Sequence, residues 1–461
     1  MNRKPHIIHL MIVIGLLIGL AACGTPATPT AQPPAAATQA PEVEVQPTEQ
    51  PPAAATEAPE VEVQPTEIPA QGPPAEFTFT GWAMNEGASK EVVNGFMKSY
   101  SEANNVVIKE QAFPYGETLN QLVLQATGGS AEGAAQLDIA WLATMAATGK
   151  LMDLSAYAGG QGYTEAALRS GQVNGIQYGL PWTTGSIGLA ANKQILDEAG
   201  VTEMPETIAE FEAALVKIKA YDPEIIPYAG MTAAAQLKDI VPWIWTFGGT
   251  VIDENGEVTL GDAGSVAALE WYKSLLDRGL MAPEMDRFTA RQLFSQGKVA
   301  FYDDAIVLKG IVTKDSPIPN LGDLIVPLSR PVLNAGDTPQ ALLWGHVVVV
   351  FEGENSQPAA EWVQFLTSDL DTATTYFEEM ALPPTTEDAL NSEAVTSDSF
   401  TSNWSQSITA TAGSNPFAVY AESARMESIL TEQVNAYLVG SVASAQEALD
   451  KAAADISALM E

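Results

Sequence analysis

One stretch, from Gly175 to Val201, sets the organisation that we expect of this chain. Its first part, Gly179 to Gly185, reads GLPWTTG, which combines turn-forming residues with an aromatic side chain. Its second part predicts a short buried strand at Ile187 to Ala191 and then a helix at Lys193 to Ala199. Because proline fixes one backbone angle while glycine leaves others free, the sequence predicts a bend at which the chain crosses between two lobes.

The N-terminus has the pattern of a secretory signal. Two basic residues precede an apolar run from Ile7 to Leu20, which is too short to span a bilayer comfortably. The run closes with small residues and the only cysteine of the chain, Cys23, in what resembles a lipoprotein cleavage box. We therefore expect residues 1–23 to be a lipoprotein signal peptide and Cys23 to become the lipidated first residue. The alternative is a plain signal peptide with an incidental cysteine.

Residues 24–75 have no apolar periodicity and consist mainly of Pro, Ala, Thr, Gln and Glu. The segment Gln32 to Glu49 recurs almost letter for letter as Gln50 to Glu67. Such a composition buries too little apolar surface to offset the entropy of ordering the chain. We expect a disordered tether, with a recognition tail for a proline-binding partner as the alternative.

Length and charge restrict what the rest of the chain does. Nearly four hundred residues follow the tether, which is more than one hydrophobic core usually holds, so we expect two lobes. The net charge of −36 argues against nucleic acid and against an anionic lipid surface as partners. An anionic substrate is expected only if positive groups are concentrated locally.

The inventory of reactive side chains argues against most kinds of catalysis. Two of the three histidines lie in the signal, so that the mature chain keeps only His346. A zinc site built from Cys and His is therefore excluded, and no phosphate-cradling glycine motif is present. We expect no enzyme, no metal and no cofactor. Acidic residues are abundant enough that a glycosidase using a carboxylate pair, with Asp303 and Asp304 as the best candidates, remains an alternative.

The first elements after the tether follow one another as strand, helix, strand, helix. We predict strands at Glu76 to Thr80, Val106 to Ile108 and Asp138 to Leu142, with helices between them. This order implies a parallel sheet with helices on its faces. Ligands of such sheets bind beyond the carboxyl ends of the strands, which selects the loops Trp82 to Glu86 and Trp141 to Thr144.

Several motifs of the folded part resemble the extracellular solute-binding proteins of the sugar-binding family that feed ABC importers. The loop at Leu180-Pro181 precedes a strand that ends in Asn192-Lys193 and a helix that ends in Ala-Gly-Val. The match continues as FGG at 247–249 and as FSQGKVAF at 294–301, over about Phe77 to the C-terminus. The resemblance implies an α/β, two-lobed, periplasmic-binding-protein-like fold of type II, with a sheet flanked by helices in each lobe.

The resemblance also implies where the chain passes between the lobes. A second crossing is expected near Gly322 to Pro331 and a third at Ala381 to Pro384. The N-terminal lobe would comprise residues 76–184 plus 331–381, and the C-terminal lobe residues 185–330 plus 382–461.

Sugars present apolar C–H faces and rings of hydroxyls, so their pockets need aromatic platforms together with amide and carboxylate groups. Several tryptophans fall at predicted strand ends or crossings of both lobes, and core packing is the alternative for each of them, above all for Trp243 and Trp245. Together with the positions that the family resemblance indicates, the candidate ligand-binding residues are Trp82, Asn85, Glu86, Tyr115, Trp141, Thr144, Trp182, Thr183, Trp243, Trp245, Asp303, Asp304, Trp344, Gly345 and His346. The family often has a tyrosine before the Asn-Lys pair, where this chain has Ala190-Ala191, which leaves the identity of the sugar open.

These observations predict a lipid-anchored, monomeric solute receptor at the outer face of the cytoplasmic membrane or in the periplasm. It would close on a sugar or oligosaccharide and deliver it to the permease of an ABC importer. The alternatives are a receptor for another polar solute, such as a polyamine or a glycerol phosphodiester, a surface glycosidase, and a structural lipoprotein.

Overall fold

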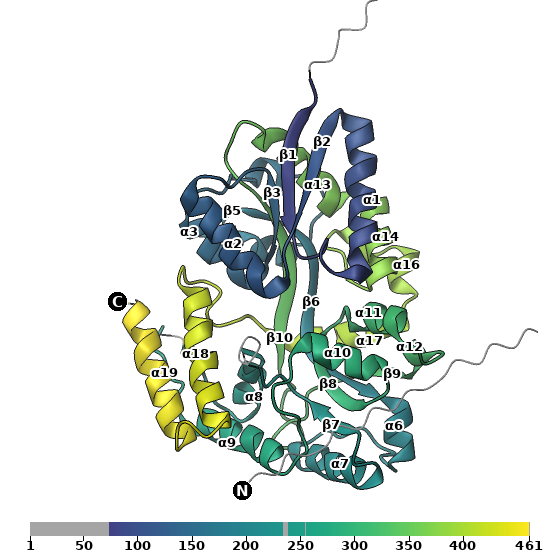
Figure 1. Cartoon of the computed structure of the whole chain (residues 1–461), viewed down its shortest axis with the longest axis vertical. Coiled ribbons are helices and arrows are strands. Elements are labelled where there is room, and N and C mark those ends of the chain that lie inside the picture. The colour runs from purple at the N-terminus through teal and green to yellow at the C-terminus, as the bar shows by residue number, and fades with distance from the viewer. Residues whose placement is uncertain (1–72, 234–237, 254, 461) are drawn as a thin grey trace, which may run out of the picture. The chain divides into compact units, whose positions relative to one another are not determined.

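The computed structural model describes residues 73–233, 238–253 and 255–460. The predicted signal peptide, Cys23 and the predicted tether up to residue 72 lie outside these residues. None of the described helices combines the length and the apolar composition that crossing a bilayer requires. The described chain forms two lobes, in which helices pack around a mixed sheet (Figure 1).

Three parallel strands form the sheet of the first lobe. They are β1 (Ala75–Gly81), β2 (Val106–Ala112) and β3 (Ala134–Asp138), in the order β2-β1-β3. Helix α1 (Gly87–Asn104) follows β1, and helix α2 (Tyr115–Gly128) follows β2. The predicted alternation of strands and helices is therefore confirmed, and the loops after β1 and β3 lie at the carboxyl edge of this sheet.

The strand predicted at residues 138–142 lies further toward the N-terminus. Strand β3 ends at Asp138, and a 3-10 turn, η1 (Ile139–Trp141), leads into helix α3 (Leu142–Ala147). The Asp138 carboxylate accepts a hydrogen bond from the Ala140 backbone nitrogen at 3.0 Å and so caps the turn. The prediction was wrong because a short apolar run does not distinguish a buried strand from a buried helical turn.

Two long strands join the lobes. Strand β10 (Ala341–Val350) runs antiparallel to β3 on one side and to β6 (Gly179–Asn192) on the other. The C-terminal part of β6 pairs in turn with β8 (Val299–Ala305) and β9 (Ile325–Leu328), which belong to the second lobe. The strand order β2-β1-β3-β10-β6-β8-β7 therefore runs through both lobes as a single sheet.

The segment Gly179 to Gly185 is extended, and the turn predicted there is wrong. His346 of β10 pairs with Thr183 of β6, but the next residue of β10, Val347, pairs with Pro181. Trp182 is therefore the extra residue of a β-bulge, a feature that bends a strand without breaking it. Proline is tolerated at such a bulge because one ladder hydrogen bond is missing there in any case.

The second lobe is built around β8. Strand β7 (Ile226–Ala229) pairs with it in parallel. The helices that follow one another in this lobe are α6 (Lys193–Glu198), α7 (Ile208–Tyr221), α8 (Val241–Thr246), α9 (Ala263–Asp277), α10 (Arg287–Ser295), α11 (Leu308–Asp315), α12 (Leu321–Leu324), α18 (Ser423–Leu438) and α19 (Ala445–Met460).

The remaining elements are short or cover the joining strands. They are α4 (Ser155–Ala158), α5 (Glu165–Ser170), β4 (Gln172–Val173), β5 (Ile176–Gln177), α13 (Ser356–Ser368), α14 (Leu370–Met380), α15 (Glu387–Leu390), α16 (Glu393–Thr396), α17 (Ser399–Ser407), η3 (Thr409–Thr411) and β11 (Ala412–Gly413).

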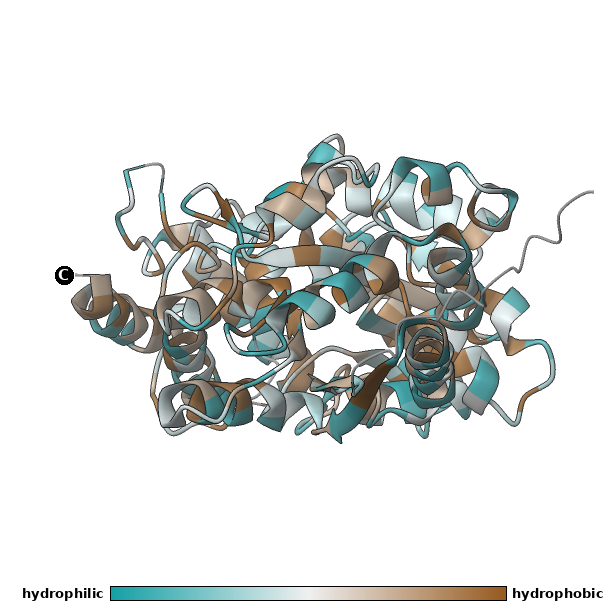
Figure 2. Cartoon of the chain, turned by 90° about the horizontal axis from the view of Figure 1, so that it is seen from above, coloured by the Kyte–Doolittle hydropathy of each residue, from teal (hydrophilic) through white to brown (hydrophobic). Residues whose placement is uncertain are grey.

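The apolar core continues across the junction of the lobes. One cluster of buried side chains contains Phe77 and Trp362 of the first lobe together with Phe294 and Tyr302 of the second. A separate cluster around Trp243 fills the rest of the second lobe. Figure 2 shows the hydrophobic residues gathered on the central strands, with hydrophilic residues on many of the outer helix surfaces. The joining strands are thus anchored in core on both sides.

Gly345 provides a test of the packing between β6 and β10. A Cβ atom at this position would lie 2.6 Å from the Thr183 carbonyl oxygen, which is closer than real contacts allow. We expect Gly345→Ala to lower the free energy of unfolding by about 1–3 kcal/mol, measured by urea denaturation. Gly353→Ala is the matched control, since a Cβ there meets no atom within 4 Å. Equal stability of the two variants would contradict the close packing described here.

Candidate ligand-binding site

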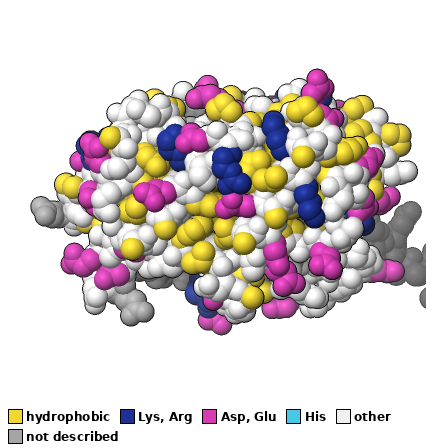
Figure 3. Space-filling model, turned by 90° about the horizontal axis from the view of Figure 1, so that it is seen from below, with side chains coloured by type: hydrophobic (Ala, Val, Ile, Leu, Met, Phe, Trp, Pro, Cys, Tyr) yellow, Lys and Arg dark blue, Asp and Glu magenta, His cyan; other side chains and the backbone are white. Residues whose placement is uncertain are grey.

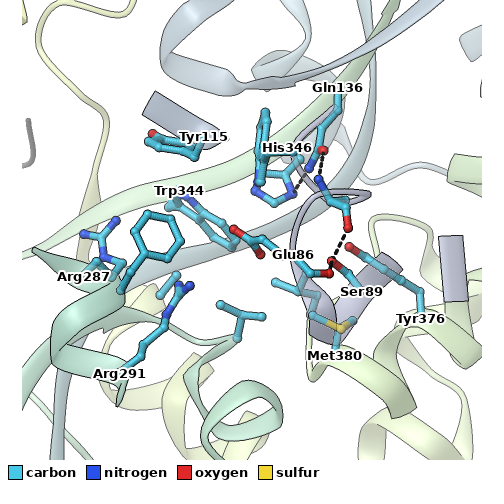
Figure 4. A pocket seen from close by; sticks show the side chains of 16 residues that line it. Glu86, Ser89, Tyr115, Gln136, Arg287, Arg291, Trp344, His346, Tyr376 and Met380 are labelled. Carbon is cyan, nitrogen blue, oxygen red and sulfur yellow. Dashed lines mark hydrogen bonds between the residues drawn. The ribbon is translucent and has the colours of Figure 1, made fainter. Parts of the chain in front are cut away.

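A cavity lies where the two lobes face each other (Figure 4). Its wall combines the loop after β1, the start of α1 and α2, and β3 with α10, β8, β10 and the end of α14. The lining residues are Trp82, Ala83, Glu86, Ser89, Tyr115, Gln136, Arg287, Phe288, Arg291, Ala305, Val307, Trp344, His346, Tyr376, Met380 and Leu382. Both lobes and one joining strand therefore contribute side chains to a single cavity.

Trp82 is held on several sides by other rings. Its ring centroid lies 5.3 Å from that of Tyr115 and 5.3 Å from that of Trp141, in edge-to-face geometry. His346 meets Trp82 edge-on at 4.8 Å, and Trp344 meets His346 at 4.5 Å. Trp82, Tyr115 and Trp344 line the cavity. Trp141 does not line it, but its ring packs against those of Trp82 and Tyr115. Because these contacts fix the ring orientations, the cavity presents rigid aromatic walls.

The hydrogen bonds of Gln136 fix the position of the proton on His346. The Ala83 backbone N–H donates to Gln136 Oε1 at 3.0 Å, which identifies the other end of the amide as the Nε2 group. This group lies 3.2 Å from His346 Nδ1, and because an amide NH₂ only donates, Nδ1 accepts (Figure 4). The neutral imidazole therefore carries its proton on Nε2, which is buried and has no hydrogen-bond partner among the described residues.

His346 stays neutral at ordinary pH. Burial lowers the pKa of His346 to about 4, although the Asp138 carboxylate opposes this and Arg291 adds to it. The side chain, which lines the cavity, consequently carries one N–H donor and no charge. An unpaired buried donor is costly, so a ligand oxygen that accepts from Nε2 would relieve that cost.

Two arginines of α10 border the cavity, and each is held by aspartate. Arg291 donates from Nε and Nη2 to the carboxylate of Asp304 at 2.6 and 2.9 Å. Arg287 forms ion pairs with Asp239 and, at 3.3 Å, with Asp304. Burial by itself would lower the pKa of Arg291, but the Asp304 carboxylate outweighs it and raises that pKa. The aspartates neutralise and orient both guanidinium groups.

Five of the predicted site residues line this cavity. They are Trp82, Glu86, Tyr115, Trp344 and His346. Asn85 is exposed in an adjoining hollow, which shares Glu86 and Arg291 with the cavity.

Three other candidates, Trp243, Asp303 and Asp304, are buried in the second lobe. Trp243 is fully buried, with the Arg330 guanidinium 4.3 Å from its ring centroid. Arg330 also forms a buried ion pair with Asp303 at 2.7 Å. Asp304 is occupied by the two arginines of α10. These residues do not line the cavity, because each is enclosed by its own partners.

Three candidates on β6 and β10, and Trp245 on α8, do not line the cavity. Trp182 is buried and stacks on Tyr376, with the ring centroids 4.7 Å apart and the planes inclined by 15°. Thr183 and Gly345 are packed against each other where the two strands pair. Trp245 is half-buried and packs against both large apolar clusters, at the side of Gly413.

Thr144 takes part in a contact between the lobes. Its hydroxyl donates a hydrogen bond to the Ala421 carbonyl oxygen at 2.9 Å, just before α18. In the opposite direction, the Ser423 hydroxyl donates to the Ala140 carbonyl oxygen at 3.1 Å. Thr144 therefore bonds protein across the junction and does not line the cavity.

The sequence analysis missed the second-lobe wall of the cavity. Arg287, Phe288 and Arg291 stand just before the motif at 294–301, and α10 brings all three to the cavity. The available signal was the pair of arginines one helical turn apart in a chain with few basic residues. Tyr376 and Gln136 carried no comparable signal.

Comparison with known proteins identifies the family. Residues 95–401 match the family model described as bacterial extracellular solute-binding protein, and this chain belongs to that family. The chain is 24% identical over 283 residues to a binding protein of Brucella abortus (strain 2308), which covers 59% of this chain and 67% of that protein. It is 31% identical over 172 residues to the diacetylchitobiose binding protein DasA of Streptomyces coelicolor, which covers 34% of this chain and 38% of DasA.

Solved structures confirm the predicted two-lobed α/β fold. The maltose-bound MalE3 of T. maritima has a TM-score of 0.75 and 20% identity, over 84% of this chain and 100% of that chain. The GacH receptor of Streptomyces glaucescens GLA.O has a TM-score of 0.75 and 22% identity, over 84% of this chain and 98% of GacH.

The lowered pKa of His346 predicts a pH dependence of stability. Between pH 6.5 and about 4 the unfolded chain binds a proton at this position that the folded chain does not, so folding loses free energy as the pH falls through this window. Between pH 7 and pH 5 we expect this side chain to contribute a loss of about 2 kcal/mol. In urea titrations at both pH values, His346→Gln should show a smaller loss than the natural protein. Identical losses would mean that His346 is protonated as easily in the folded chain as in water.

Proposed function

We propose that this protein is the lipid-anchored receptor of an ABC importer and that it binds a sugar or oligosaccharide in the cavity between the lobes. The observation that carries the proposal is the mixed origin of the cavity wall. Trp82 and Tyr115 come from the first lobe, Phe288 and Arg291 from the second, and Trp344 from a joining strand. A solute that contacts all of them requires the lobes to be closed.

The chemistry of the wall suits a carbohydrate. The rings of Trp82 and Trp344 offer surfaces for the apolar faces of a sugar. The Nε2–H of His346 and the carboxylate of Glu86 offer a donor and an acceptor for hydroxyl groups. MalE3 was solved with maltose, and DasA is named for diacetylchitobiose, which supports the same class of ligand for this chain.

Closure would be the signal that a permease reads. A ligand shifts an open-closed equilibrium by its differential affinity for the two states. We assign residues 76–184 plus 331–381 to the N-terminal lobe and 185–330 plus 382–461 to the C-terminal lobe, so that β6 passes from one to the other. The bonds of Thr144 and Ser423 across the junction would hold the closed form.

The anchor and the partners follow from the sequence. We propose that Cys23 is lipidated and that the segment up to residue 75 tethers a monomeric receptor to the outer face of the cytoplasmic membrane, or in the periplasm. On the face drawn in Figure 3, the Lys and Arg side chains stand apart among acidic and apolar ones. This distribution and the net charge of −36 favour an uncharged or cationic solute over a polyanion.

The two best candidates for the carboxylate pair of a glycosidase, Asp303 and Asp304, are both engaged in ion pairs. Asp303 is paired with Arg330, and Asp304 is paired with Arg287 and Arg291. Neither carboxylate lines the cavity. We therefore propose binding and release of an unchanged solute.

Trp344 and Trp243 together test the proposal. A thermal-shift panel of monosaccharides, oligosaccharides, polyols, a polyamine and a glycerol phosphodiester would first identify a ligand. We expect Trp344→Ala to weaken binding of that ligand by about tenfold and to abolish the decrease in radius of gyration that scattering detects on binding. Its loss of stability should be far smaller than that of Trp243→Ala, which we expect to cost about 3–5 kcal/mol.

Two results would count against the proposal. If no carbohydrate or polyol raises the melting temperature while the polyamine or the phosphodiester does, the ligand belongs to another class. If Trp344→Ala unfolds as easily as Trp243→Ala, then Trp344 is a core residue and not a wall of the site.

A further inference from the structure

Glu86 lies in the cavity without a direct partner. It follows β1 immediately before α1, and Figure 4 shows its carboxylate directed into the cavity, toward Trp344. Across residues 73–233, 238–253 and 255–460, no side chain donates a hydrogen bond to this carboxylate or forms an ion pair with it. Burial raises the pKa of Glu86, Arg291 works against the rise, and Asp304 adds to it. The folded chain therefore keeps a partly buried acid whose charge is poorly compensated.

The nearby cations are already engaged. Arg291 gives two hydrogen bonds to Asp304, and Arg287 forms ion pairs with Asp239 and Asp304. Two guanidinium groups thus meet three carboxylates once Glu86 is included, and the set carries one excess negative charge when all three carboxyl groups are ionised. His346 adds no charge, because it is neutral at ordinary pH.

The rings around Glu86 also suit a cation. Trp82, Tyr115, Trp344 and Tyr376 line the same cavity, whereas the ring of Phe288 already has the Arg291 guanidinium 5.5 Å from its centroid. The negative faces of aromatic rings attract ammonium groups, most strongly where water is excluded. The net charge of −36 would further concentrate cations around the protein. A wholly neutral sugar uses the rings and the hydroxyl-binding groups but leaves the excess charge in place.

We propose that the ligand carries a protonated amino group that pairs with Glu86, so that the receptor prefers a basic saccharide, such as an amino sugar, to its neutral counterparts. This inference rests on the proposed function, because it names the class of solute that the same cavity takes. Aromatic rings would receive the sugar faces, and His346 Nε2–H would donate to a ring or hydroxyl oxygen.

The test compares ligands that differ only at one substituent. Glucosamine, N-acetylglucosamine and glucose share one ring, and acetylation or replacement by hydroxyl removes the positive charge. Each would be titrated calorimetrically into the natural protein at pH 7 and low salt, as the monosaccharide and as the β-1,4-linked dimer. Because a hydrogen bond to a charged group contributes more than a neutral one, we expect the amino forms to bind roughly tenfold more tightly than both neutral forms.

Glu86→Gln and Glu91→Gln form a matched pair of variants. Both remove one negative charge at or beside the start of α1, but Glu91 is exposed and does not line the cavity. We expect the ratio of amino to neutral affinities to fall to about one in Glu86→Gln and to remain unchanged in Glu91→Gln. A circular dichroism spectrum and a melting curve of each variant confirm that it is folded.

The outcomes separate this inference from the proposed function. Neutral sugars that bind as tightly as the amino forms, or a ratio that Glu86→Gln leaves unchanged, would overturn the inference while leaving a sugar receptor intact. Equal losses of the ratio in both variants would also overturn it, because the effect would then be one of general charge. If none of these sugars binds but the wider panel contains a neutral ligand, the inference again fails and the receptor function stands.

Discussion

The pairing of β6 with β10 is the interaction on which the rest of the molecule depends. These strands lie side by side through the middle of the only large sheet among the described residues, and each also pairs with strands of one lobe. Their side chains are largely buried along their whole length. A backbone ladder enclosed in core on both faces is stiff, so that changes in lobe geometry must arise as bending or twisting of this ladder and not as separation.

The same strands bring the cavity and the core into contact. Trp344 and His346 lie two residues apart on β10, on the same face, and both reach the cavity. Trp182, the bulged residue of β6, stacks behind Tyr376. The second-lobe wall is organised differently, because its arginines are positioned by buried aspartates. Contacts between rings therefore fix the side chains of one cavity wall, and ion pairs with aspartates fix the arginines of the other.

Much of the fold could be predicted from the sequence. Helix α7 begins at a capping box of Thr207 and Glu210, and α1 buries an apolar face of Val93, Phe96, Met97 and Tyr100 at helical spacing. These features depend on residues close together in the chain, which is why local pattern reveals them. The extended conformation of Gly179 to Gly185 depends instead on pairing with β10, more than 150 residues later, and no local pattern of turn residues reveals that.

The site was predictable to the extent that it follows from sheet geometry. The rule that ligands bind beyond the strand ends selected Trp82 and Glu86. It did not separate Trp344, which lines the cavity, from Trp243, which lies beneath Arg330. Both are tryptophans in apolar stretches of sequence. Trp243 differs because Arg330, from a distant segment, lies over its ring in the core. The residues next to Trp243 in the sequence do not reveal that contact.

The bulge at Trp182 has a consequence for how such a chain diverges. Loops at the surface accept insertions and deletions, whereas one residue gained or lost between Pro181 and Thr183 would abolish or double the bulge. If the change in length were carried instead as a register shift, every side chain of β6 beyond that point would exchange one face of the sheet for the other. Length variation among descendants of this protein should therefore be confined to other parts of the chain, and the spacing across the bulge should outlast the identity of the residues that form it.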